Sequence, residues 1–124
     1  MENARSLVSI VDDDESVRES LPDLLKEFGF ASQTFSSAEQ FLASDGISHT
    51  KCLILDIAMP GMTGPDLQRE LKRRGSSVPI VFITAQRDEA GQSLLIERGA
   101  VACLTKPFSD TELLDALNSA LRIK

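Results

Sequence analysis

Five short apolar runs alternate with five segments of helical periodicity, and this alternation limits the possible fold more than any other feature of the sequence. The predicted strands cover residues 7–11, 30–35, 52–55, 78–83 and 101–104. The predicted helices cover residues 15–28, a segment starting at 37, and residues 65–74, 88–98 and 109–121. Such alternation builds a parallel sheet with right-handed crossovers and helices on both faces. The sequence therefore predicts an α/β fold in a single domain over residues 1–124.

The third apolar run stops abruptly on an acid. Three adjacent aliphatic residues at 53–55 favour a strand that is buried on both faces, and Asp56 follows them directly. Pro60 and Gly61 then turn the chain out of the sheet into a loop. Asp56 is therefore predicted at the C-terminal tip of a strand. A single acid in this place is usually a loop residue or a helix cap, so its meaning depends on the other strand ends.

Composition and charge argue against several functions. The net charge of −6 argues against binding of nucleic acid by the surface of this domain. No apolar run approaches the ~20 residues that cross a bilayer, and residues 1–5 lead into a predicted strand rather than a signal peptide. We therefore expect a cytoplasmic domain without a membrane segment. The single histidine, His49, lies in a polar linker over 44–50 and is predicted to be a solvated surface residue.

Polar side chains able to handle a phosphate or a metal follow four of the five apolar runs. They are Asp12 and Asp13, Asp56, Thr84, and Lys106. In an open parallel sheet, ligands bind outside the carboxyl ends of the strands. The three carboxylates, the hydroxyl and the ammonium group are therefore expected at one edge of the sheet.

This set of groups is what phosphoryl transfer requires. Three gathered acids repel one another unless a cation lies among them, and oxygen ligands without His or Cys favour Mg²⁺. Lys106 supplies a counter-charge for a phosphoryl group, Thr84 can donate to one of its oxygens, and Asp56 is the candidate nucleophile that forms an acyl phosphate. Taken singly, residues 12–14 could merely cap the next helix and Lys106 could be a surface lysine. Their joint position at strand ends favours the site.

The chain resembles the receiver domain of two-component response regulators from residue 9 to residue 121. The motifs that carry the resemblance are Val11-Asp12-Asp13-Asp14, the segment Leu55-Asp56-Ile57-Ala58-Met59-Pro60-Gly61-Met62-Thr63-Gly64, Ile83-Thr84-Ala85, and Lys106-Pro107-Phe108. The second and fourth motifs are similar to those of FixJ-like and LuxR-type transcriptional regulators. The resemblance implies a flavodoxin-like doubly wound (βα)5 fold with a five-stranded parallel sheet of order 2-1-3-4-5.

The resemblance also implies roles for the acidic residues. Asp56 would accept a phosphoryl group from a phosphohistidine on a sensor histidine kinase. Asp13 and Asp56 would bind Mg²⁺ directly together with the backbone carbonyl of Ala58, and Asp12 would act through a water molecule. The domain would be no enzyme in the ordinary sense, because it would catalyse only its own phosphorylation and dephosphorylation.

Further roles implied by the resemblance concern the opposite side of the site. Thr84 and Lys106 would hold the phosphoryl group, and the Lys106-Pro107 peptide bond would be cis. Cys103 stands where the family usually has a Tyr or Phe ring that moves with the hydroxyl residue, so a switch here would involve Thr84 and a thiol instead. The helices over 88–98 and 109–121 would form a homodimer on phosphorylation, and a DNA-binding output domain would lie outside this chain.

The two cysteines test the topology. Cys52 and Cys103 both lie within apolar runs, which predicts small buried side chains in a reducing compartment. In the order 2-1-3-4-5 their strands are separated by the fourth strand, at about 9–10 Å from strand spacing. That separation predicts two free thiols, because a disulfide cannot span it.

Three other functions share part of this pattern. An aspartyl-phosphate phosphatase of the haloacid-dehalogenase type is suggested by Asp12-x-Asp14-x-Ser16, but that reading leaves Asp56 without a role and lacks an acidic pair after Lys106. A flavodoxin-like FMN protein would need Ser, Thr and Gly after the first strand, where three aspartates would repel the phosphate. A pseudo-receiver is disfavoured because no residue of the site is missing.

Overall fold

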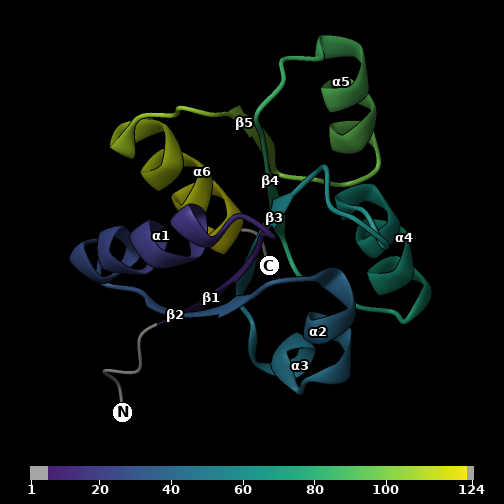
Figure 1. Ribbon diagram of the computed structural model, residues 1–124, viewed down its shortest axis with the longest axis horizontal. Helices are drawn as coiled ribbons and strands as arrows, with labels where there is room; N and C mark the ends of the chain where they lie inside the picture. Colours follow the sequence, from purple (N-terminus) through teal and green to yellow (C-terminus); the bar gives the residue numbers. More distant parts are fainter. Residues whose placement is uncertain (1–5, 123–124) are drawn as a thin grey trace.

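A computed structural model describes residues 6–122 and contains one five-stranded sheet with helices on both faces (Figure 1). The strands are β1 (Leu7–Val11), β2 (Ala31–Phe35), β3 (Cys52–Asp56), β4 (Ile80–Thr84) and β5 (Ala102–Thr105). The helices are α1 (Glu15–Glu27), α2 (Ala38–Ala43), α3 (Gly46–His49), α4 (Gly64–Arg73), α5 (Glu89–Glu97) and α6 (Asp110–Arg122). All strand pairs are parallel and their order is β2-β1-β3-β4-β5. The predicted fold and strand order are confirmed.

Each face of the sheet has its own apolar core because successive side chains of a strand point to opposite faces. Ile54 of β3 packs in a cluster with residues of α1 and α6, whereas Leu53 and Leu55 pack in a second cluster with residues of α2, α4 and α5. Figure 1 accordingly places α1 and α6 on one side of the strands and the remaining helices on the other. All five residues of β3 are buried, as the aliphatic run predicted.

The predicted polar linker over 44–50 contains a helix that the sequence analysis did not predict. The one-turn helix α3 is closed by a hydrogen bond from the Thr50 amide to the Gly46 carbonyl at 2.9 Å. The buried Thr50 hydroxyl lies 2.6 Å from the same carbonyl and 2.6 Å from the Ser9 hydroxyl of β1. This turn therefore depends on polar contacts with a distant strand, which apolar periodicity cannot reveal. His49 is exposed, as predicted.

Helix α1 is continuous through Pro22. Proline lacks the N–H that would bond to the preceding turn, which costs the helix one hydrogen bond. Leu21 and Leu25 on either side of it are buried in the core, and this burial compensates for the missing bond. Strand β2 lies at one edge of the sheet, a position that suits the polar residues within it.

Cys52 and Cys103 are both free, and β4 lies between their strands, which confirms the predicted absence of a disulfide. Cys52 is fully buried, but Cys103 is only partly buried and so departs from the expectation of a core residue. Among the helices of residues 6–122, none has the length and apolar character to cross a bilayer.

Candidate functional site

The carboxyl ends of the strands surround a cavity of about 500 Å³. Six of the predicted site residues line it: Asp12, Asp13, Asp56, Ala58, Thr84 and Lys106. The predicted switch residue Cys103 and Pro107 do not line this cavity but an adjoining hollow that shares Lys106. They reach one place because β1, β3, β4 and β5 are parallel and end at the same edge of the sheet. The structure therefore brings together residues that are up to 94 positions apart in the sequence.

Three carboxylates lie close together in the cavity. Asp12, Asp13 and Asp56 each offer an oxygen atom, and these oxygens lie within 4.8 Å of one another. Asp12 has no exposed surface and Asp56 is 6% exposed, whereas Asp13 faces solvent. Buried carboxylates need a cation or hydrogen-bond donors nearby to remain charged. The oxygen-only donor set and its spacing fit a hard divalent cation such as Mg²⁺.

Asp12 already has polar partners within the protein. One carboxylate oxygen accepts a hydrogen bond from the Asp14 amide at 2.8 Å, and the other lies 3.2 Å from the Lys106 ammonium. The Arg18 guanidinium of α1 donates to the backbone carbonyl of Asp12 at 2.9 Å. Arg18 was not predicted as a site residue, because a surface arginine within a helix carries no local sequence signal. Asp14 caps α1 by accepting from the Ser16 amide at 2.9 Å.

Unlike Asp12, Asp56 accepts no hydrogen bond from an amide and forms no ion pair among residues 6–122. Burial, followed by the negative charge of Asp12, raises the pKa of Asp56 to about 7, although the charge of Lys106 opposes this change. A contact between its side chain and the carboxyl of Asp13 also raises this pKa. The carboxylate form of Asp56 is therefore costly at neutral pH in the absence of a bound cation.

This raised pKa predicts that Asp56→Asn stabilises the domain in EDTA at neutral pH. A carboxyl with a pKa of about 7 in the folded state and about 3.9 in the unfolded state favours folding below pH 4 and loses that contribution as pH rises towards 7. Asparagine does not titrate, so the variant is expected to gain about 1–3 kcal/mol over the wild type near pH 7.5. Urea unfolding in EDTA at pH 5 and pH 7.5 measures the gain. A gain that does not grow with pH contradicts the assignment.

The hydroxyl of Thr84 bonds to the loop after β4. It donates to the Gln86 carbonyl at 3.2 Å and accepts from the Gln86 amide at 3.1 Å. The thiol of Cys103 contacts the Gln92 carbonyl of α5 at 3.9 Å, and burial raises its pKa to about 11. Thr84 therefore contacts the loop that leads into α5, and Cys103 contacts α5 itself. The Lys106-Pro107 peptide bond is cis, the isomer that the resemblance implied.

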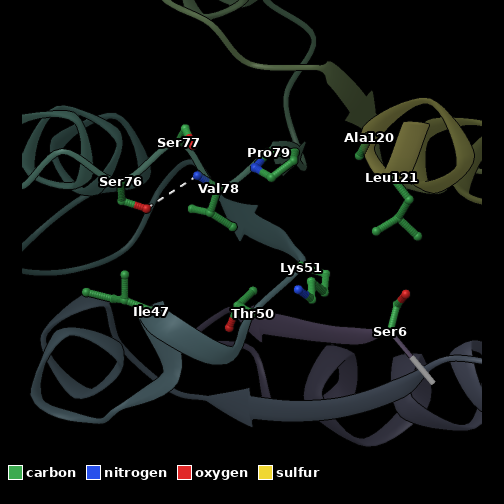
Figure 2. Close-up of a pocket in the computed structure, with 10 residues that line it drawn as sticks. All are labelled: Ser6, Ile47, Thr50, Lys51, Ser76, Ser77, Val78, Pro79, Ala120 and Leu121. Atoms are coloured by element: carbon green, nitrogen blue, oxygen red, sulfur yellow. Dashed lines mark hydrogen bonds between the residues drawn. The ribbon is translucent and has the colours of Figure 1, made fainter. Parts of the chain in front are cut away.

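A second hollow, of about 600 Å³, lies at the opposite edge of the sheet, where the strands begin (Figure 2). Ser6, Lys51 and Pro79, which directly precede β1, β3 and β4, line it together with Thr50 and Leu121. Among residues 6–122, Lys51 is the only charged residue that lines it. The described residues of this hollow include no grouped acids like those around Asp56, so the chemistry is assigned to the cavity around Asp56.

Comparisons with known proteins agree with the motifs and the fold. The model of the response regulator receiver domain family matches residues 8–118. The response regulator protein TodT of Pseudomonas putida is 42% identical over 123 residues, which are 99% of this chain and 54% of TodT. Nodulation protein W of Bradyrhizobium diazoefficiens is 41% identical over 118 residues, which are 95% of this chain and 52% of that protein. The chain thus spans about half the length of these curated relatives.

Solved structures show the same similarity. The response regulator StyR matches with a TM-score of 0.89 and 42% identity, covering 97% of this chain and 61% of StyR. The FixJ-N structure matches with a TM-score of 0.86 and 36% identity, covering 96% of this chain and 95% of FixJ-N. Family model, relatives and structures agree over nearly the whole chain. The chain therefore belongs to the response regulator receiver domain family.

Proposed function

We propose that this receiver domain accepts a phosphoryl group on Asp56 from a phosphohistidine of a sensor histidine kinase and thereby switches an output. The observation that carries the proposal is the position of Asp56: it is nearly buried, and it shares one cavity with Asp13, Thr84 and Lys106. A carboxylate in this place is available as a nucleophile and is surrounded by groups that suit a phosphoryl group.

Asp13 and Asp56 are the residues that would hold Mg²⁺ directly, with the backbone carbonyl of Ala58 as a third ligand and Asp12 acting through water. The grouping of the three carboxylate oxygens and the raised pKa of Asp56 support this assignment, because a cation would favour the charged form. When bound, the ion would neutralise charge on the phosphoryl oxygens. Both effects favour transfer to Asp56.

In the transfer step, an oxygen of Asp56 forms a bond to phosphorus while the bond from phosphorus to the histidine nitrogen breaks. The electron pair of the broken bond returns to the imidazole, which leaves. Lys106 is placed to bind a phosphoryl oxygen, since its ammonium already reaches into the cavity at Asp12. The Thr84 hydroxyl would donate to another oxygen of the phosphoryl group.

The same step suggests how the output is switched. The Thr84 hydroxyl must release the Gln86 carbonyl, to which it donates, before it can donate to the phosphoryl group. That release would free the loop before α5 and reposition the start of the helix, where Gly91 lowers the cost of a backbone change. Cys103 would take part through its contact with the Gln92 carbonyl rather than by moving a large ring.

The relatives suggest the output itself. They include proteins named as transcriptional regulatory proteins, among them FixJ of Azorhizobium caulinodans. We therefore propose a cytoplasmic transcriptional regulator in which this domain controls a DNA-binding domain elsewhere in a longer protein. Phosphorylation would favour a homodimer through α5 and α6. The net charge of −6 argues that the receiver domain does not itself bind DNA.

Incubation with acetyl phosphate tests the proposed function. Removal of the metal is expected to inhibit phosphorylation of the domain. Intact-protein mass spectrometry should detect one added phosphoryl group on the wild-type domain in the presence of Mg²⁺. The same incubation in EDTA should reduce the labelled fraction by at least about tenfold. The grouped carboxylates of the cavity then face the phosphoryl group without a cation. Equal labelling with and without Mg²⁺ would count against the proposed metal site.

A further inference from the structure

The loop that joins Asp56 to α4 carries Ala58, and it is held at its base and middle by the core. At its base the Gly64 amide donates to the Ile57 carbonyl at 3.0 Å. In its middle the side chain of Met59 is buried in the cluster formed with α2, α4 and α5. Ala58 lies between these two anchors and is exposed at the rim of the cavity.

The outer arm of the loop is held by a residue from another part of the chain. The carboxylate of Glu39, in the first turn of α2, accepts a hydrogen bond from the Met62 amide at 3.0 Å. The preceding residue, Gly61, has a φ of +73°, and a Cβ built on it would lie 2.8 Å from the same carboxylate oxygen. Glycine at 61 thus permits both the left-handed backbone and the close approach of Glu39.

We propose that Glu39 is a positioning residue for the metal site, acting through this loop. The inference rests on the proposed function, in which the Ala58 carbonyl is a Mg²⁺ ligand. The Gly64 amide fixes the base of the loop and Met59 fixes its middle, and the Glu39 bond to Met62 restricts the arm that returns from Met59 to α4. Loss of this bond lets the loop sample arrangements in which the carbonyl is misplaced, and Mg²⁺ affinity falls although no direct ligand has changed.

Two substitutions separate the hydrogen bond from the charge. Glu39→Gln keeps an oxygen that can accept from the Met62 amide but removes the negative charge, whereas Glu39→Ala removes both. Glu27→Ala is the matched control, because Glu27 is an exposed glutamate at the far end of α1. Its substitution changes the net charge by the same amount as Glu39→Ala. NMR on the whole domain supplies two readouts: the Mg²⁺ dissociation constant from a titration, and the hydrogen exchange rate of the Met62 amide in EDTA.

Glu39→Ala should weaken Mg²⁺ binding by about three- to tenfold and speed Met62 exchange by about tenfold, while Glu39→Gln and Glu27→Ala stay within about twofold of the wild type. Equal weakening by Glu39→Gln and Glu39→Ala would overturn the positioning role in favour of a charge effect. Wild-type affinity in Glu39→Ala would overturn the positioning role and leave the proposed function standing. A wild-type domain that binds no Mg²⁺ would overturn both.

Discussion

The Asp56→Asn variant is expected to take up no phosphoryl group from acetyl phosphate or from a phosphorylated kinase. The amide oxygen of asparagine is a poor nucleophile, and the other carboxylates described in the cavity differ from Asp56. Asp12 is occupied by Lys106 and the Asp14 amide, and Asp13, Asp14 and Asp88 are exposed. Labelling should therefore fall to background, a loss of at least about 100-fold.

Unfolding cannot account for that loss, because the same variant is expected to be more stable than the wild type in EDTA at neutral pH. Intact-protein mass spectrometry and urea unfolding on one preparation measure both properties. Asp23→Asn, which changes an exposed acid on α1, is the matched control and should be labelled like the wild type. Undiminished labelling of Asp56→Asn would show that another residue carries the phosphoryl group.

Gly64→Ala is expected to cause the largest loss of stability of the substitutions considered. A Cβ at position 64 would lie 2.3 Å from the backbone oxygen of Asp56, 3.0 Å from Cα of Ile57 and 3.0 Å from the ring of Phe82. Two of these atoms belong to the backbone of Asp56 and Ile57, so they cannot move without distorting the end of β3. We expect a loss of about 3 kcal/mol or more in the free energy of unfolding.

Gly75→Ala is the comparison for this prediction. Gly75 has a φ of +81°, but a Cβ there would meet no atom within 4 Å. Its replacement should cost about 1–2 kcal/mol through backbone strain alone. Urea unfolding at equal Mg²⁺ concentration measures both variants. A loss in Gly64→Ala no greater than that in Gly75→Ala would mean that α4 can move away from β3 at little cost.

The fold was predictable because each local signal agreed with the others. The aliphatic run before Asp56 became a strand with all residues buried, and the run over 30–35 became a strand at one edge of the sheet. The helix predicted to start at residue 109 begins with a capping box, in which Ser109 and Glu112 form hydrogen bonds of 2.8 and 3.0 Å. The grouping of polar residues at one edge followed from parallel strand direction, so the members of the site were predictable before their distances were known.

The contacts that the sequence did not reveal join distant segments. Lys106 lies against Asp12, 94 residues away. Its position after a strand predicts only a contact with a phosphoryl group. Glu39 bonds to Met62 across 23 residues. The turn α3 depends on a contact between Thr50 and Ser9. Each depends on side-chain directions in the folded protein, and neither periodicity nor a motif encodes those directions.

The most direct test of the account is to locate the phosphoryl group on the chain. Borohydride reduces an acyl phosphate of aspartate to homoserine, so treatment of the phosphorylated domain followed by peptide mass spectrometry identifies the residue that carried it. We predict homoserine at position 56 and unmodified aspartate at positions 12 and 13. Homoserine at position 12 would instead support the phosphatase alternative and contradict the assignment of Asp56 as the phosphoacceptor.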